Sequence, residues 1–431
     1  MNFNSFQAQI VRLLQKPLVR NTFWMLLSQG LKLFVQAAYF VIIARALGTE
    51  QYGAFVGITS LVAILTPFAN LGSGDILVKN VSRNRALFKE YWANALFTCA
   101  IASFFITILV LVAAQIFLSK SISLWVALLV ALSDLFFLNI LSMAAQAFIS
   151  VGLLKFTAQI YILYSLKNFI AAIIFIQFLK NSGIEVWSFL YLASTAISAL
   201  GVFILVNYLI GSPKLGKSNI KPELTQGFLF SVSLSAKTIN NNIDKTMLAS
   251  LSTLAATGIY AAAYRLIDVA FVPVTSLAAA AYAKFFQQGE GGIRGSLKFA
   301  KRLLPIVGGY GFVAGLGLFL LAPVVPYILG GEYTDAVAAL RWLAPIPCLK
   351  AIQYLAADSL TGSGFQWGRS AIQVAIALFN LLINLWLIPA YSWKGAAWAS
   401  LASDGLLMLS LWGMVFWLYR QEVQKIKSNE H

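Results

Sequence analysis

The sequence has very little of the chemistry on which most enzymes depend. Its only histidine is His431, and its two cysteines, Cys99 and Cys348, lie inside apolar stretches. These counts exclude a histidine proton relay or histidine-ligated metal, and they argue against a disulfide framework or a thiolate metal site. The sequence also lacks the GxSxG, Walker-type and HExxH patterns. We therefore expect no catalytic residues, no bound metal and no cofactor.

Charged residues are also scarce, at 11% of the 431 residues, whereas 60% are hydrophobic and the mean hydropathy is +0.80. Apolar runs of about 20 residues or more recur along the whole chain, which is not the pattern of a soluble domain. Residues 1–20 alternate apolar and basic side chains, as an interfacial amphipathic helix does. The apolar run after them is too long for a cleavable signal peptide. The composition predicts an all-α polytopic membrane protein.

Hydropathy and turn residues divide the chain into twelve predicted transmembrane helices joined by short connections. Their predicted limits are 21–46, 52–73, 91–118, 122–150, 156–179, 186–210, 226–251, 255–283, 303–329, 336–361, 367–389 and 395–419. We predict a cytoplasmic amphipathic segment at 1–20, six-helix bundles at 21–210 and 226–420, a cytoplasmic linker at 211–225 and a cytoplasmic tail at 421–431. No connection is long enough to form a further domain.

The net charge of +16 is explained by membrane topology, so we expect no nucleic-acid partner. With the N-terminus in the cytoplasm, twenty of the 31 Lys and Arg residues fall on the cytoplasmic side and five on the outer side. This asymmetry follows the positive-inside rule and favours twelve spans with both termini in the cytoplasm.

The two halves of the sequence resemble each other weakly. Gly53-Ala-Phe55 opens the second predicted span and Gly258-Ile-Tyr260 opens the eighth, and a proline follows each, Pro67 and Pro273, at a similar distance. An offset of about half the chain, with an even number of spans in each half, is typical of parallel repeats. We therefore predict two six-helix bundles related by a pseudo-two-fold axis along the membrane normal.

Six basic residues fall inside the predicted spans: Lys32, Lys167, Lys237, Lys245, Arg265 and Lys350. A charge at the bilayer centre costs ~3 kcal/mol or more when it faces lipid, so these residues must face protein or a water-filled interior. A cationic interior between membrane helices indicates an anionic cargo. Lys167 and Lys350 lie near predicted helix ends, and we expect their ammonium groups to reach the lipid headgroups.

Polar stripes support an interior position for the others. Lys32 lies on one face of the first span together with Ser28 and Gln36, and Lys237 and Lys245 belong to the strongly polar seventh span. Arg265 and Asp268 are three residues apart on a helix, a spacing that permits an ion pair as well as a functional role.

Several stretches of this sequence resemble the polysaccharide-transport branch of the multidrug/oligosaccharidyl-lipid/polysaccharide exporter superfamily, the O-antigen-type lipid-linked oligosaccharide flippases. The stretches that carry the resemblance are Ala44-Arg-Ala-Leu-Gly-Thr-Glu-Gln-Tyr-Gly53, Asn242-Ile-Asp-Lys-Thr-Met-Leu248, Gly258-Ile-Tyr-Ala-Ala-Ala-Tyr-Arg265, Leu329-Gly-Gly-Glu-Tyr333, Leu340-Arg-Trp-Leu343, Asn380-Leu-Leu-Ile-Asn384, Ile388-Pro389 and Gly395-Ala-Ala397. They are spread over the whole chain in the family's order.

The resemblance implies two bundles in a V around a cationic central cavity that opens alternately to either side. It implies a polyprenyl-pyrophosphate-linked oligosaccharide repeat unit as cargo, moved to the outer leaflet of the inner (plasma) membrane for O-antigen lipopolysaccharide, capsule or exopolysaccharide. The matching positions include Arg45, Asp244, Lys245 and Arg265. We expect a monomer that contacts membrane lipids, with a glycan polymerase as a possible partner.

The candidate substrate-binding residues are therefore cations, with two carboxylates as candidates for ion coupling or charge pairing. The cations are Lys32, Arg45, Lys237, Lys245 and Arg265, and the carboxylates are those of Asp244 and Asp268. The alternative is a drug or cation exporter of the same superfamily, in which acidic cavity residues would matter more. A membrane-embedded glycan polymerase is disfavoured because no large outer loop exists.

Overall fold

The computed structural model describes residues 17–179, 182–214 and 221–429, and every element assigned in these ranges is a helix. Within these ranges the structure describes the backbone but not the side chains at 17–33, 154, 221–226, 229, 230, 232–234, 236, 237, 279, 280, 283 and 425–429. Most of the predicted amphipathic segment 1–20 and part of the predicted linker 211–225 lie outside the described residues.

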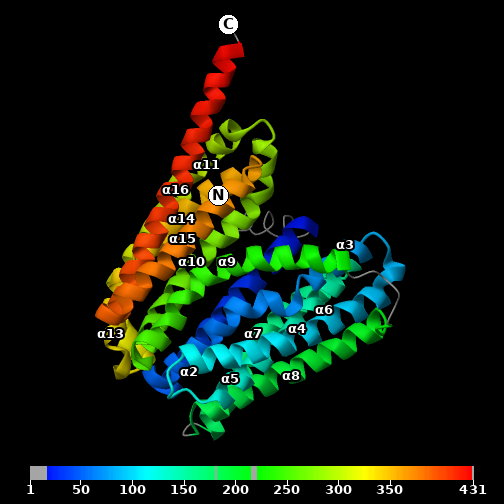
Figure 1. Cartoon of the computed structure of the whole chain (residues 1–431), viewed down its shortest axis with the longest axis vertical. Coiled ribbons are helices and arrows are strands. Elements are labelled where there is room, and N and C mark those ends of the chain that lie inside the picture. The colour runs from blue at the N-terminus through cyan, green and yellow to red at the C-terminus, as the bar shows by residue number, and fades with distance from the viewer. Residues whose placement is uncertain (1–16, 180–181, 215–220, 430–431) are drawn as a thin grey trace, which may run out of the picture.

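The helices form two lobes that diverge from a common vertex, as Figure 1 shows. The first lobe, the N-lobe, consists of α2 (Pro17–Asn70), α3 (Ser73–Val81), η1 (Arg85–Leu87), α4 (Phe88–Phe117), α5 (Leu124–Ala131), η2 (Leu132–Phe137), α6 (Leu138–Ser150), α7 (Leu154–Phe178) and α8 (Gly183–Leu209). The C-lobe consists of α9 (Lys221–Leu251), α10 (Leu254–Gly289), α11 (Ile293–Leu321), η3 (Ala322–Val324), α12 (Val325–Leu329), η4 (Gly331–Tyr333), α13 (Asp335–Leu343), α14 (Ile346–Gly362), α15 (Gln366–Tyr391) and α16 (Trp393–Asn429).

Nine helices within the described ranges are long and apolar enough to cross a membrane. The two arms of α2, which correspond to the first two predicted spans, meet at Gly48, whose backbone is not helical (φ 70°, ψ 179°). Only glycine adopts such a positive φ at little cost. Helix α9 lies at the seventh predicted span, and α13 with α14 lies at the tenth. The predicted all-α membrane fold with two helical bundles is confirmed.

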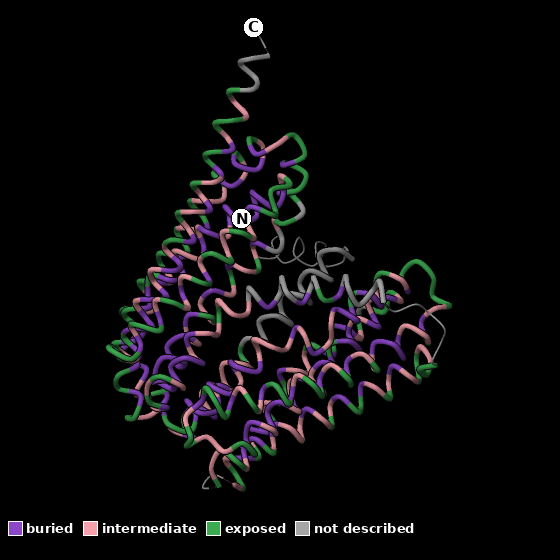
Figure 2. Tube along the Cα trace, viewed as in Figure 1, coloured by how far each residue is buried: buried purple, intermediate pink, exposed green. Residues whose placement is uncertain are grey.

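Buried residues lie toward the inside of each lobe and exposed residues lie mostly on its outer faces (Figure 2), where many of them are apolar. Phe104 and Phe105 on α4 are both 63% exposed, and Phe312 and Val313 on α11 are 64% and 65% exposed. Water would not tolerate such contiguous apolar faces, whereas lipid tails match them. The exposed surface therefore agrees with the bilayer environment that the composition predicts.

Helix α9 joins the two lobes by packing. Its N-terminal half lies along the second arm of α2, where Ser231 Oγ donates a hydrogen bond to the Pro67 carbonyl over 2.7 Å. Further along the helix Ala249 contacts Gly57, and α9 also packs on α15 of the C-lobe. Helix α9 therefore forms part of the wall between the lobes.

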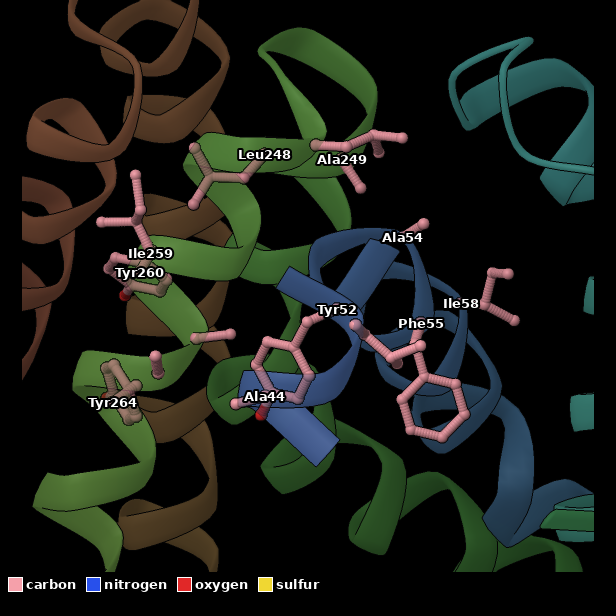
Figure 3. Close-up of a cluster of buried hydrophobic side chains, with 14 of the residues drawn as sticks. Ala44, Tyr52, Ala54, Phe55, Ile58, Leu248, Ala249, Ile259, Tyr260 and Tyr264 are labelled. Carbon is pink, nitrogen blue, oxygen red and sulfur yellow. The ribbon is translucent and has the colours of Figure 1, made fainter. Parts of the chain in front are cut away.

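The lobes meet at the vertex through glycines at equivalent positions of the sequence repeat. A Cβ atom at Gly53 would lie 1.8 Å from the Leu254 carbonyl oxygen, and one at Gly258 would lie 2.0 Å from the Thr49 carbonyl oxygen. Small residues allow membrane helices to approach this closely. Figure 3 shows buried side chains of α2, α9 and α10 gathered around this contact. The reciprocal pattern agrees with the predicted pseudo-two-fold relation.

Candidate functional site

The candidate site is a hollow between the lobes that consists of two adjoining cavities. The N-lobe cavity, of about 410 Å³, is lined mainly by α2, η2, α7 and α8, and the C-lobe cavity, of about 440 Å³, by α9, α10, α14, α15 and α16. Asn242, Lys245 and Asp268 line both cavities. Each volume is in the range of small-molecule sites, and the shared residues join the two cavities.

Lys245 and Arg265 come together at this hollow, as the sequence analysis predicts. Lys245 Nζ donates to the Asn241 carbonyl over 2.8 Å and lies 4.6 Å from the centre of the Tyr264 ring. Arg265 lines the N-lobe cavity from α10. Within the described residues, neither cation has a carboxylate within 4.0 Å. Both charges are therefore available to a bound anion.

Lys350 and Arg369 also line the hollow, and the prediction for Lys350 is wrong. Lys350 does not reach the headgroups, because its Nζ lies 2.9 Å from Tyr264 Oη and 4.0 Å from Asp404 Oδ2 in the C-lobe cavity. Arg369 lies 3.7 Å from Asp358 Oδ1 and donates to Thr361 Oγ1 over 2.7 Å. Carboxylates on other helices, which the local pattern does not reveal, hold both cations inside the protein.

The prediction for Lys167 is also wrong, because neutral hydrogen-bond partners hold it inside the N-lobe. Its side chain is buried in the N-lobe, where Nζ donates to Asn168 Oδ1 over 2.7 Å and to Thr195 Oγ1 over 2.8 Å. The ammonium group also lies 5.0 Å from the centre of the Tyr191 ring. A buried cation needs such partners to offset its desolvation. Lys167 is thus part of the framework behind the N-lobe cavity and not a residue at the headgroups.

The three remaining predicted cations are Arg45, Lys32 and Lys237. Arg45 is exposed, three residues before the Gly48 kink, and lines neither cavity, so its assignment to the cavity is corrected. Lys32 on α2 and Lys237 on α9 lie outside the described side chains.

The two predicted carboxylates have different surroundings. Asp244 is buried at 2% exposure, accepts hydrogen bonds from the Tyr260 hydroxyl and the Lys245 amide, and lies 3.4 Å from Ser400 Oγ. Asp268 is exposed and lines both cavities. Within the described part of the chain Asp268 forms no ion pair with Arg265. Asp244 therefore stabilises the packing of α9 on α10 and α16, whereas Asp268 faces the hollow.

The hollow is less cationic than the sequence analysis predicts. The described basic lining residues are Lys245, Arg265, Lys350 and Arg369, and the acidic ones are Asp134, Asp268 and Asp404. The acidic residues come from three helices that are distant in sequence, so their position around one hollow depends on the tertiary fold. Among the described residues, those of the hollow included, no cluster of three or more His, Cys, Asp or Glu side chains could hold a metal ion.

The N-lobe wall contributes two further polar residues, Asp134 and Gln36, to the hollow. Asp134 lies on η2, a π-helical segment between α5 and α6, and accepts a hydrogen bond from the Tyr191 hydroxyl over 2.9 Å. Irregular π-helical turns inside helices occur frequently at functional sites. Gln36, which belongs to the predicted polar stripe of the first span, lines the same cavity and donates to Ser165 Oγ over 3.2 Å.

The hollow is closed at the vertex by contacts between α2 and the C-lobe. The Thr49 amide donates to Glu332 Oε2 over 3.2 Å, and the Tyr333 hydroxyl donates to the Ala44 carbonyl over 2.9 Å. Burial raises the pKa of Tyr333 well above its usual value, so the hydroxyl keeps the proton that it donates. These bonds and the glycine contact close one end, while the lobes diverge at the other end, near α3 and the C-terminal turns of α16 (Figure 1).

Comparison with known proteins identifies a related family and fold. A family model described as "Polysaccharide biosynthesis protein" matches residues 18–287. An inward-facing multidrug resistance MATE family transporter of the MOP superfamily is similar in structure, with a TM-score of 0.71 at 16% identity over 89% of this chain and 96% of its own. The lipid II flippase MurJ in an inward closed conformation has a TM-score of 0.74 at 11% identity over 91% of this chain and 87% of its own.

An outward-facing MATE family transporter is less similar, with a TM-score of 0.58 at 16% identity over 91% of this chain and 96% of its own. Among curated proteins, none matches this chain in sequence. At these identities the solved structures establish the fold, and the family model covers more than half of the chain.

Proposed function

The chain belongs to the polysaccharide biosynthesis protein family, and on that premise we propose that it is a flippase for a polyprenyl-pyrophosphate-linked oligosaccharide repeat unit. The cargo moves from the cytoplasmic to the outer leaflet during synthesis of O-antigen, capsule or exopolysaccharide. The observation that carries the proposal is the hollow between the lobes, where Lys245 and Arg265 have no carboxylate partner among the described residues.

The proposed role of the basic residues is to replace the water around the pyrophosphate. An anion that leaves water loses its hydration, and charge-assisted hydrogen bonds from Lys and Arg offset that loss. Lys245 and Arg265 supply unpaired charge, while Lys350 and Arg369 bring further donors that are already held in place by Asp404 and Asp358. The polyprenyl tail is too apolar for this hollow and remains in the lipid.

The proposed transport cycle is alternating access about the vertex. The positive-inside pattern assigns the diverging end to the cytoplasm and the Gly48 end to the outside. With its diverging end open to the cytoplasm, the hollow would load cargo from that side. This agrees with the TM-scores, which are higher for the inward-facing than for the outward-facing MATE transporter. Opening the outer end requires Thr49 and Ala44 to separate from Glu332 and Tyr333, while Gly48 absorbs the change in backbone angle.

The membrane potential is sufficient as a driving force for an anionic cargo. It contributes ~2.3 kcal/mol per charge per 100 mV, and with the inside negative it favours outward passage of the pyrophosphate. Of the two candidate carboxylates, we propose Asp268 for any charge coupling, because it faces the hollow whereas Asp244 is buried in hydrogen bonds. We further propose that the protein acts as a monomer in the plasma membrane, with both termini in the cytoplasm, and delivers its product to a glycan polymerase.

One observation favours a second candidate function, export of a cationic drug. Asp134, Asp268 and Asp404 line the hollow beside the basic residues, and carboxylates would attract a cation. Asp404 has Lys350 as a partner at 4.0 Å and Asp134 accepts from Tyr191, which leaves Asp268 as the freest of the three. We rank this function second because Lys245 and Arg265 in the hollow have no carboxylate within 4.0 Å among the described residues.

The test is a transport assay with the purified full-length chain in liposomes. A polyprenyl-pyrophosphate-linked oligosaccharide is placed in both leaflets, and a membrane-impermeant glycosidase measures how fast the inner pool becomes accessible. We expect rapid access to the whole pool with the protein and access to the outer pool alone without it. Movement of a cationic dye with no movement of the lipid-linked oligosaccharide would favour the second candidate and reject the first.

A further inference from the structure

The two cavities of the hollow differ in the chemistry of their walls. The N-lobe cavity is lined by six aromatic side chains, those of Tyr39, Phe40, Tyr52, Phe55, Tyr164 and Tyr191. The C-lobe cavity has fewer aromatic residues and adds Lys350 and Arg369 to the shared Lys245. The headgroup of a lipid-linked oligosaccharide also has two chemically different parts, an anionic pyrophosphate and sugar rings that bear hydroxyl groups.

The aromatic wall of the N-lobe cavity is held in a fixed arrangement. Phe55 packs edge-on against Tyr191 at 5.4 Å between ring centres, and against Trp187 at 5.9 Å. Phe40 packs against Tyr52 at 5.9 Å between ring centres. Rings fixed in this way present rigid apolar faces at little entropic cost. The C–H face of a pyranose sugar is apolar and packs well on such rings.

Neutral and acidic hydrogen-bonding groups lie among these rings. Gln36 and Ser165 bond to each other and keep further donor and acceptor capacity. Asn168 accepts from the buried Lys167 through its carbonyl oxygen, so its NH₂ group remains available, and Asp134 has one carboxylate oxygen bonded to Tyr191. Several oriented donors and acceptors around an apolar face are what recognition of sugar hydroxyl groups requires.

The described basic residues of the N-lobe cavity come from the other lobe, Lys245 from α9 and Arg265 from α10. In the C-lobe cavity Lys350 and Arg369 already lie beside Asp404 and Asp358, so among the described lining cations Lys245 and Arg265 are the two without a carboxylate within 4.0 Å. An anion is therefore favoured where these two cations lie, whereas the aromatic wall of the N-lobe cavity suits an uncharged group.

We propose that the N-lobe cavity is a subsite for an uncharged sugar and that the pyrophosphate binds where the two cavities adjoin, at Lys245 and Arg265. This division rests on the proposed function and adds a substrate class to it. The first sugar of the repeat unit lies against the aromatic wall and bonds to Gln36, Asn168 and Asp134. A sugar carboxylate in this position would be repelled by Asp134, so the subsite selects hydroxyl- and acetamido-bearing sugars.

The experiment measures binding of two lipids to the purified full-length protein: polyprenyl pyrophosphate without sugar, and the same lipid bearing one N-acetylglucosamine. The N-lobe variants are Gln36→Ala and Asp134→Asn, and the variant of the shared cation is Lys245→Met. We expect each N-lobe variant to weaken binding of the sugar-bearing lipid at least tenfold and that of the sugarless lipid less than twofold. Lys245→Met should weaken binding of both lipids by a similar factor.

The matched control is Gln51→Ala, because Gln51 is exposed and lines neither cavity, and it should leave both affinities unchanged. Two independent N-lobe variants guard against misfolding of one, and each is used only if it elutes as the wild type does on size exclusion. A lipid bearing one glucuronic acid should bind the wild type more weakly than the N-acetylglucosamine lipid, and Asp134→Asn should narrow that difference.

The outcomes separate the subsite from the function on which it rests. Wild-type protein that binds both lipids, with N-lobe variants that weaken both equally or neither, overturns the division into subsites alone. Tighter binding of the glucuronic acid lipid than of the N-acetylglucosamine lipid overturns it too. Wild-type protein that binds neither pyrophosphate lipid overturns the proposed function together with the subsite.

Discussion

At the scale of single residues, the partners of each charge decide what that charge can do. Lys167, Lys350 and Arg369 each have fixed partners, whereas Lys245 and Arg265 have no carboxylate within 4.0 Å among the described residues. A paired cation offers a bound anion less free energy, because part of its field is already neutralised. The unpaired cations should therefore contribute most to binding and transport.

Replacing Lys245 or Arg265 by Ala should reduce transport of the lipid-linked oligosaccharide at least tenfold. Loss of one charge-assisted hydrogen bond to a phosphate costs about 1.5–3 kcal/mol, which corresponds to roughly a tenfold to hundredfold effect. Arg265→Lys should retain part of the activity, because it keeps the charge but loses the planar donor fork. The measurement is the glycosidase-accessibility assay, with Lys298→Ala on the exposed face of α11 as the control. Normal transport by both Ala variants would remove these residues from the site.

Asp244 should affect stability more than binding. Asp244→Ala removes the buried carboxylate that accepts from the Tyr260 hydroxyl and leaves that hydroxyl with Ser400 Oγ, 2.8 Å away, and a hydrogen bond to a charged group contributes about 1.5–3 kcal/mol. We expect a lower unfolding temperature in detergent for this variant, and a smaller decrease for Asp244→Asn, which keeps an acceptor oxygen. An unchanged unfolding temperature in Asp244→Ala would show that these hydrogen bonds contribute nothing.

At the scale of helices, the vertex is where α2 and α10 come closest. Gly53 and Gly258 each face a backbone carbonyl of the other lobe, so the contact has no room for a side chain. The two hydrogen bonds from Thr49 and Tyr333 lie beside this contact and link the Gly48 kink to the C-lobe. Closure of the outer end therefore combines these two hydrogen bonds with the close packing of α2 on α10.

A methyl group at either glycine should loosen this closure. Gly53→Ala and Gly258→Ala would each force the helices apart, because the new Cβ would lie about 2 Å from a carbonyl oxygen. With Cys99 and Cys348 replaced by Ser, the reporter is Ile259→Cys, which is buried at the vertex, labelled by a membrane-impermeant maleimide.

We expect severalfold faster labelling of the reporter in either alanine variant. Gly201→Ala should have no effect, because a Cβ there meets open space within 4 Å. Equal labelling rates in all backgrounds would mean that the glycine contact does not control access to the vertex.

At the scale of the whole molecule, the sequence predicts the architecture well and the site only in part. Span lengths, the glycines of the repeat and the positive-inside pattern depend on local sequence, and the two-bundle membrane fold is confirmed. The convergence of Lys245 and Arg265 is also predicted, because Lys245 lies in a polar span and both residues lie in segments that resemble the family. Arg45 was assigned to the cavity by family resemblance alone, and the structure leaves it exposed.

The rest of the site depends on contacts between distant helices. Asp404 holds Lys350 inside the protein, and Asp134 faces the hollow from a π-helical turn, and the neighbouring sequence does not show which partner either carboxylate has. Pairing across a sequence separation of tens of residues sets which charges are neutralised. The predicted strongly cationic cavity therefore becomes a hollow with an excess of one positive charge among its described lining residues.

The position of the cargo is the central claim, and photo-crosslinking tests it most directly. A benzophenone amino acid replaces Asn242, which lines both cavities, or Phe312, which lies on the exposed apolar face of α11. With a radiolabelled polyprenyl-pyrophosphate-linked oligosaccharide, we expect the glycan to crosslink at 242, to be displaced by excess unlabelled lipid, and not to crosslink at 312. A transport-competent protein whose glycan crosslinks at 312 and never at 242 would contradict the account.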